Sequence, residues 1–156
     1  MHRSRPVTDV AHAGLTVPDL EDALAMWCDG LGFTLERSFT LDETVTRGTT
    51  GVQGSTIRAA TVTLGAHRIE LLQYSPPHPR TGASDPARTG AVHIALVVDD
   101  LEEVVGVCGR HGWRAVGSPH LMSTGSRAGT RITYLEGPRG GLIELIAPPS
   151  TRDETH

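Results

Sequence analysis

The sequence lacks several features that mark common classes of protein. No apolar run approaches the roughly 20 residues that a membrane-spanning helix requires, so we expect no membrane partner. The net charge of −4 lacks the basic excess that is typical of nucleic-acid-binding proteins. Aromatic residues make up only 4% of the chain, which also argues against a surface for stacking bases. These absences argue against nucleic acid and membranes as partners.

Cysteine is also scarce. Cys28 and Cys108 each fall in an expected helix, and neither has a second cysteine at C-x-x-C spacing, so we interpret both as buried free thiols. Residues 1–6 carry positive charge, but no apolar stretch follows them, and the sequence predicts no signal peptide. Together these features predict a cytoplasmic protein.

The chain contains one pattern twice. His12 opens the stretch H-A-G-L-T-V-P-D-L-E-D, and His93 opens H-I-A-L-V-V-D-D-L-E-E in the same register. Each half ends on an I-E-L triplet, centred on Glu70 in the first half and on Glu144 in the second. One histidine and one glutamate per half make four potential metal ligands, which indicates a metal site between two copies of one module.

Hydrophobic periodicity predicts the same order of elements in each half: a strand, a helix and three further strands. Asp19 and Asp100 precede the two expected helices as N-caps. The expected strands cover 9–17, 33–41, 56–64 and 67–74 in the first half, and 91–98, 114–116, 131–136 and 142–147 in the second. The segment 117–129 is rich in Gly, Ser and Thr and is a candidate mobile flap.

We therefore predict a single domain over residues 8–148, because 156 residues suffice for one core and not for two. The expected class is α+β, with two βαβββ modules pairing into one curved mixed sheet that encloses a metal-binding cup. The predicted boundaries are module one over 8–75, a proline-rich linker over 76–90, module two over 91–148, and flexible tails over 1–7 and 149–156.

Side chains alternate between the two faces of a strand, and this alternation favours the two histidines and two glutamates as ligands. His12 shares its face with Gly14, and His93 shares its face with Ala95, so a small residue leaves space beside each imidazole. In the I-E-L triplets the carboxylate points away from its two apolar neighbours. A lone carboxylate within an apolar strand is costly unless it is paired or bound to a metal.

The chain resembles members of the vicinal oxygen chelate superfamily, which contains glyoxalase I, methylmalonyl-CoA epimerase, extradiol dioxygenases and bleomycin-resistance proteins. The likeness rests on the two histidine stretches, L-G-F at 31–33, R-I-E-L-L at 68–72 and G-G-L-I-E-L at 140–145. The resemblance implies that His12, Glu70, His93 and Glu144 hold one divalent metal per site, with Ni, Co, Zn, Mn and Fe all possible. It also implies that Glu144 or Glu70 acts as the catalytic base, and that the protein is a homodimer.

The full ligand set favours a redox-neutral, glyoxalase-like isomerase, lyase or epimerase acting on a small substrate that chelates the metal through oxygen, as in a tailoring step of specialised metabolism. Two alternatives stay open: an Fe(II)-dependent dioxygenase of the same superfamily, and a metal-free protein that sequesters an antibiotic. Residues 52–55 contain no carboxylate where methylmalonyl-CoA epimerases carry an additional catalytic glutamate, which argues against their two-base route. Whether the modules pair within one chain or across a dimer also stays open.

Overall fold

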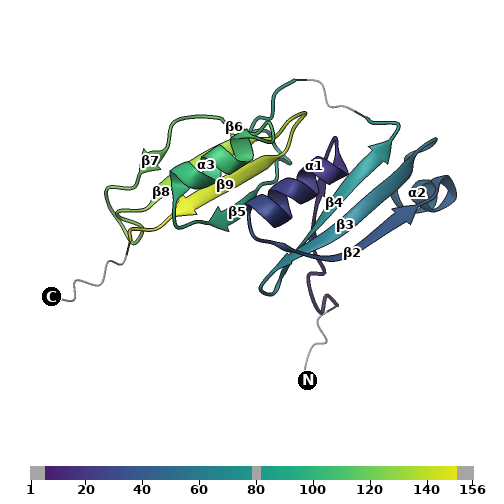
Figure 1. Ribbon diagram of the computed structural model, residues 1–156, viewed down its shortest axis with the longest axis horizontal. Coiled ribbons are helices and arrows are strands. Elements are labelled where there is room, and N and C mark those ends of the chain that lie inside the picture. Colours follow the sequence, from purple (N-terminus) through teal and green to yellow (C-terminus); the bar gives the residue numbers. More distant parts are fainter. Residues whose placement is uncertain (1–5, 79–81, 151–156) are drawn as a thin grey trace.

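Each half of the chain begins with a strand and a helix and continues with further strands. The computed structural model describes residues 6–78 and 82–150. Module one contains, in chain order, β1 (Ala13–Thr16), α1 (Leu20–Leu24), η1 (Ala25–Gly30), β2 (Thr34–Leu41), α2 (Glu43–Thr50), β3 (Thr56–Leu64) and β4 (His67–Ser75) (Figure 1). Module two contains β5 (Ile94–Val97), α3 (Leu101–Gly109), β6 (Arg114–Ala115), β7 (His120–Leu121), β8 (Arg131–Glu136) and β9 (Leu142–Ala147).

An aspartate starts the helix that follows the first strand of each module. The side chain of Asp19 accepts a hydrogen bond from the backbone N–H of Asp22 at the start of α1, and Asp100 accepts one from Glu103 at the start of α3. Each carboxylate satisfies a helical N–H group that has no partner within the helix. Both expected N-caps are therefore confirmed. The segment η1 continues α1 as a π-helical turn.

Each module forms its own sheet. The strand order is β1-β4-β3-β2 in module one and β5-β9-β8-β6 in module two, where β7 also pairs with β8. The first strand of each module is parallel to its last strand, and the other pairs are antiparallel. The α+β class and the repeated module are confirmed. The described strands divide into two sheets, one per module, in place of the single continuous sheet that the sequence suggested.

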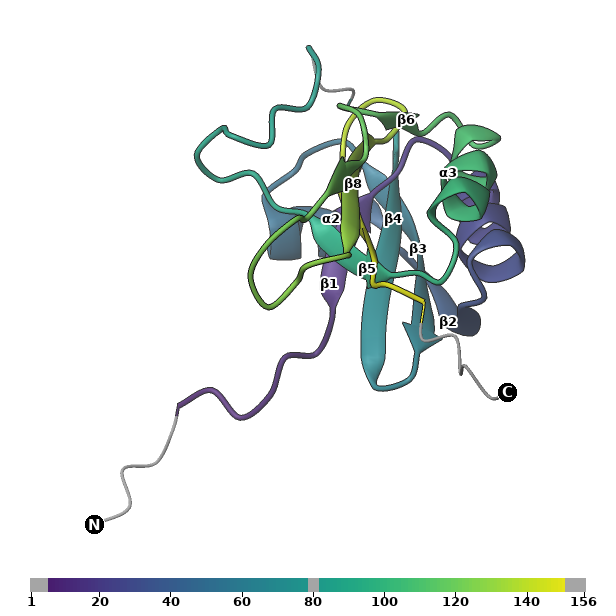
Figure 2. The ribbon, with the colours of Figure 1, turned by 90° about the vertical axis from the view of Figure 1, so that its left-hand side faces the viewer.

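One hydrophobic core connects the two modules. It contains the fully buried Trp27 and Leu71 from module one and Leu135 and Ile143 from module two. Trp27 packs edge-on against Phe33, with ring centroids 5.0 Å apart. Figure 2 shows that α1 and α3 lie together on one side of the sheets, and that α2 lies apart from them. The opposite face of each sheet is therefore not covered by α1 or α3.

The helices of the two modules approach closely at a glycine. A Cβ atom placed on Gly30 would lie 2.6 Å from Cγ1 of Val107 in α3, so only a glycine fits between η1 and α3 without movement. Nearby, Nδ1 of His111 lies 2.8 Å from a carboxylate oxygen of Asp22 and links the two modules again. These contacts fix the modules against each other through their helices.

The strands over 56–64, 131–136 and 142–147 have the predicted bounds. The opening strands are shorter than predicted, at Ala13–Thr16 and Ile94–Val97, where they pair with residues 69–72 of β4 and 143–146 of β9. Two elements were missed: α2, and the short strand β7 within the expected flap.

The described part of the linker 76–90 forms no helix or strand, and residues 79–81 lie outside the described residues. Most of the expected tails, 1–5 and 151–156, also lies outside them. In the part of the chain that the structure describes, no helix is long and apolar enough to span a membrane.

Candidate metal-binding half-sites

The register of the first sheet places Glu70 on the face opposite α1 and α3. Ile69 and Leu71 are buried in the core, so Glu70 between them points the other way. Glu70 is paired with Thr61 on one side and with Gly14 on the other. We call this face, which carries Gly14, Thr61 and Glu70, the open face of module one. His12 lies just before β1, two residues from Gly14, which corresponds to the same face of the strand.

Module two repeats the arrangement. Ile143 and Leu145 are fully buried, and Glu144 between them points to the open face of module two, which we define by Ala95, Tyr134 and Glu144. The residue opposite the carboxylate in the first strand is small in both modules, glycine in one and alanine in the other. The small residues that the sequence places on the faces of His12 and His93 thus lie opposite the two carboxylates.

Each module brings its histidine beside its glutamate. Nε2 of His12 lies 3.5 Å from a carboxylate oxygen of Glu70, and Nε2 of His93 lies 3.0 Å from one of Glu144. Both carboxylate side chains are only 13% exposed, whereas the imidazoles are 37% and 42% exposed. Each pair thus combines a carboxylate held largely away from water with an imidazole that solvent can reach.

The donor atoms of each pair are spaced as two neighbouring ligands of one metal ion. Two bonds of about 2.1 Å at a right angle place their donors about 3.0 Å apart, close to the 3.0 and 3.5 Å seen in these pairs. Imidazole nitrogen and carboxylate oxygen suit divalent transition metals. The residues therefore fit a metal as two half-sites of two ligands each.

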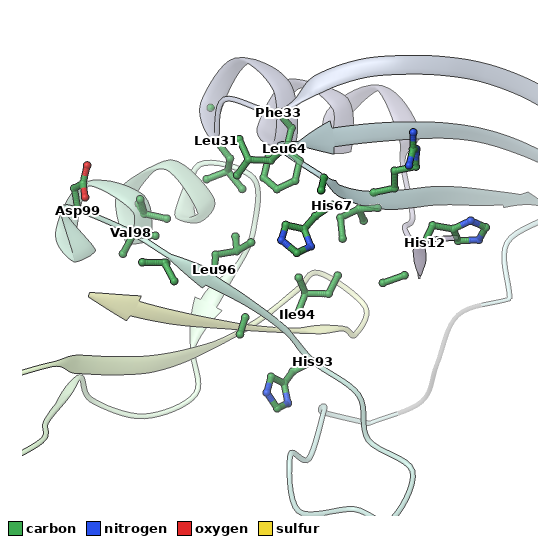
Figure 3. Close-up of a pocket in the computed structure, with 18 of the residues that line it drawn as sticks. His12, Leu31, Phe33, Leu64, His67, His93, Ile94, Leu96, Val98 and Asp99 are labelled. Atoms are coloured by element: carbon green, nitrogen blue, oxygen red, sulfur yellow. The ribbon is translucent and has the colours of Figure 1, made fainter. Parts of the chain in front are cut away.

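The two half-sites do not meet within one chain. Across residues 6–78 and 82–150, no three His, Cys, Asp or Glu side chains are grouped so that they could hold one metal ion. His12 precedes β1 and His93 precedes β5, and both line a cavity of about 770 Å³ between the modules. Figure 3 shows the two side chains at separate positions around this cavity. The structure brings the four predicted ligands together two at a time.

Other histidines make separate contacts. Besides the contact of His111 with Asp22, a ring nitrogen of His78 lies 2.9 Å from the hydroxyl of Ser55. His67 lines the cavity between the modules (Figure 3). His2 and His156 lie outside the described residues.

Sequence reasoning missed Tyr134. Its ring stands edge-on to the ring of His93, with centroids 5.1 Å apart, and it is paired across the sheet with Glu144. Burial raises the pKa of the Tyr134 phenol, and the negative charge of Glu144 and the hydrogen bond to it add to the rise. The phenol thus keeps its proton and donates a hydrogen bond to the carboxylate of this half-site. The signal was present in the sequence, because Tyr134 lies on a predicted strand next to the one that carries Glu144.

Comparison with known proteins gives a family match and a relative. The family model described as "Glyoxalase/Bleomycin resistance protein/Dioxygenase superfamily" matches residues 11–134. A 2-epi-5-epi-valiolone epimerase from Actinomyces sp. is 30% identical over 146 residues, which cover 90% of this chain and 80% of that protein.

Solved structures show the same fold. A glyoxalase family protein from Bacillus cereus superposes with a TM-score of 0.76 at 21% identity, covering 96% of this chain and 99% of the other. Glyoxalase I from Zea mays superposes with a TM-score of 0.59 at 19% identity, covering 90% of this chain and 44% of the other.

Proposed function

Because this chain belongs to the Glyoxalase/Bleomycin resistance protein/Dioxygenase superfamily, we propose that it is a divalent-metal-dependent epimerase that acts beside the carbonyl group of a hydroxylated ketone. The observation that carries the proposal is the His–Glu pair in each module. The relative from Actinomyces sp. supports the reaction class, because its name describes epimerisation of a valiolone, a ketone.

The four paired residues, His12, Glu70, His93 and Glu144, are the proposed ligands. Two imidazoles and two carboxylates suit Ni, Co, Zn, Mn or Fe as a divalent ion. An ion bound there supplies Lewis acidity toward the carbonyl oxygen, which acidifies the neighbouring C–H bond.

The carboxylates of Glu70 and Glu144 are the proposed proton carriers. One takes the proton from the carbon next to the carbonyl, and the electron pair of the broken C–H bond forms an enolate. The other, protonated beforehand, returns a proton to the opposite face of that carbon, which inverts its configuration. Each carboxylate then exchanges its proton with water. Carboxylates on two different modules are suited to this reaction because they can approach the reacting carbon from opposite faces.

An alternative way to acidify the same C–H bond is a Schiff base between the ketone and a lysine. The printed sequence contains 14 arginines and no lysine, so no lysine is present to form a Schiff base. The sequence thus favours metal-assisted proton transfer over amine catalysis.

We further propose that two copies of the chain complete each site, with His12 and Glu70 of one copy facing His93 and Glu144 of the other. The separation of the two half-sites within one chain supports this arrangement. So do Val10, Val92 and Val97, which are each more than 70% exposed and lie within four residues of the histidines. Exposed apolar side chains beside edge strands are typical of surfaces that another chain covers.

Proton exchange tests the proposed reaction most simply. Protein loaded with a single divalent metal is incubated in D₂O with a valiolone-type hydroxyketone and followed by ¹H NMR. We expect loss of the signal from the proton beside the carbonyl, appearance of an epimer and no oxygen uptake. Glu144→Gln and Glu70→Gln should slow exchange by about 100-fold or more, while Arg58→Gln, on the helix side of β3, should not.

Oxygen uptake that requires Fe(II) would replace this proposal with the dioxygenase alternative. Binding of the ketone without exchange or oxidation, under every metal condition, would favour the sequestering alternative.

A further inference from the structure

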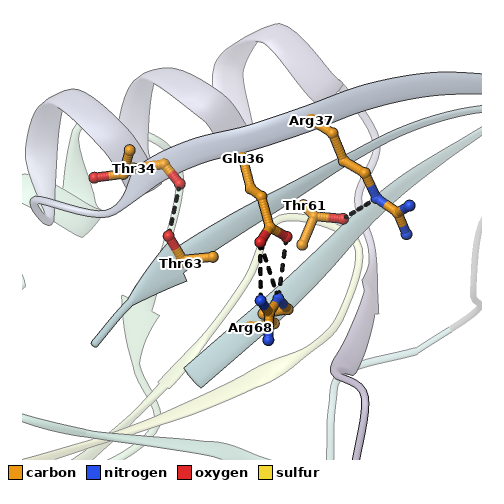
Figure 4. Close-up of polar contacts among 6 residues, drawn as sticks. All are labelled: Thr34, Glu36, Arg37, Thr61, Thr63 and Arg68. Carbon is orange, nitrogen blue, oxygen red and sulfur yellow. Dashed lines mark hydrogen bonds and ion pairs between the residues drawn. The ribbon is translucent and has the colours of Figure 1, made fainter. Parts of the chain in front are cut away.

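A β-bulge turns two adjacent charged residues of β2 toward the open face of module one. The pairing of β2 with β3 shifts register between Leu35 and Arg37, so Glu36 is an extra residue in β2. Bulges redirect side chains in this way and are frequent beside functional sites. Figure 4 shows the result: Glu36 reaches Arg68 of β4, and Arg37 reaches Thr61 of β3.

The two arginines on this face differ in their partners. Arg68 forms a bidentate pair with Glu36, with three N···O distances of 3.0 to 3.1 Å. Glu70 already has His12 beside it. Among the described residues 6–78 and 82–150, no carboxylate forms an ion pair with Arg37. Its guanidinium is therefore available to an external anion.

Two neighbours hold the Arg37 side chain in place. Its Nε donates to the hydroxyl of Thr61 at 3.4 Å, and its guanidinium carbon lies 5.1 Å from the centroid of the Phe39 ring. Thr61 is 2% exposed and is a fixed anchor. A guanidinium stacked on a ring keeps its outer N–H groups free to bind an anion, and their fork matches phosphate or carboxylate oxygens.

Arg37 and the half-site lie in one row across the sheet. Arg37 is paired with Thr61, and Thr61 is paired with Glu70. With neighbouring strands about 4.8 Å apart, the backbones of Arg37 and Glu70 are about 10 Å apart. A substrate whose reacting carbon lies near Glu70 would need an anionic group several bonds away to contact Arg37.

We propose that Arg37 binds a phosphate or carboxylate group of the substrate, so that the preferred substrate is a hydroxyketone with a remote oxyanion. This inference rests on the proposed function for the identity of the reacting group. The anion site itself needs neither the metal nor turnover, and it can be tested alone.

The first test uses inorganic phosphate and the ¹⁵N-labelled protein. The Nε–H resonance of Arg37 is assigned by its absence from the spectrum of Arg37→Gln, and that of Arg58 serves as the matched control. Arg58 lies on the neighbouring strand β3 of the same sheet and is exposed, but it pairs with Glu21 on the helix side. We expect phosphate to shift the Arg37 resonance, and the dissociation constant obtained from this shift should be at least about fivefold lower than the one obtained at Arg58. A dissociation constant at Arg37 that equals or exceeds the one at Arg58 overturns the proposal.

The second test distinguishes the two anions. Binding of D-ribulose, D-ribulose 5-phosphate and 5-ketogluconate is measured by calorimetry with and without Zn²⁺. We expect at least one anionic ketone to bind about tenfold or more tightly than ribulose, with Arg37→Gln removing the preference and Arg37→Lys retaining part of it. A preference that survives Arg37→Gln, or no preference in the wild type, contradicts the assignment. Exchange of the ketone proton has no part in this readout.

Discussion

Mixing two inactive variants tests whether two chains build each metal site. His12→Ala destroys the half-site of module one and keeps His93 beside Glu144, whereas His93→Ala does the reverse. If the sites lie across two chains, a dimer of one variant with the other has one complete site, and its second site lacks both histidines. If each site lies within one chain, every site in the mixture lacks one histidine.

The expected activity follows from counting. Equal amounts of the two variants, unfolded together and refolded, give roughly half mixed dimers by random pairing. Each mixed dimer has one working site of two, so activity and bound metal should both recover to about one quarter of the wild-type values. The measurements are proton exchange by NMR and metal content by elemental analysis after gel filtration.

The matched control mixes His12→Ala with Glu70→Gln. Both changes affect module one, so every site in that mixture lacks a ligand and recovery should stay near zero. Recovery in the control equal to that in the test mixture, or no recovery in either, would refute assembly across two chains.

Three further changes test individual contacts. Tyr134→Phe should keep the metal and lower the exchange rate about tenfold, because Glu144 loses a hydrogen-bond donor that orients it; exchange kinetics with metal analysis measure both. Gly30→Ala should lower the free energy of unfolding by about 1 to 3 kcal/mol in urea, and Val107→Ala in the same chain should recover part of it. Burial raises the pKa of Cys108 to about 11, so its alkylation at pH 8 should be far slower than in the unfolded chain. Because the folded state favours the neutral thiol, the stability that it contributes below pH 9 should fall as pH rises through 11.

The sequence predicted the fold through its internal repeat. The spacing of apolar residues predicts the strands over 56–64, 131–136 and 142–147 and the two helices. The aspartates that cap the helices support the same prediction. Helix α2 was missed because its sequence, E-T-V-T-R-G-T-T, is rich in residues with weak helix propensity. Its signals were Asp42, which caps its first turn, and Gly51, which ends it in the left-handed conformation.

The candidate site was predictable within each module but not between modules. The triplets around Glu70 and Glu144 fix the face of each carboxylate, because neighbouring residues in a strand alternate between faces. The position of one half-site relative to the other depends on contacts such as Gly30 with Val107, which no periodicity encodes. The orientation of Arg37 was equally inaccessible, since a single bulge reverses the parity of a strand.

We propose His12, Glu70, His93 and Glu144 as the ligands of one divalent metal, and metal content is the decisive test of this set. Protein is purified without chelator or affinity-resin metal, supplied with single metals and measured by elemental analysis. We expect about one Ni, Co, Zn, Mn or Fe ion per chain, lost in His93→Ala and retained in the control Arg58→Gln. No bound metal under any condition, or the wild-type amount in His93→Ala, would contradict it.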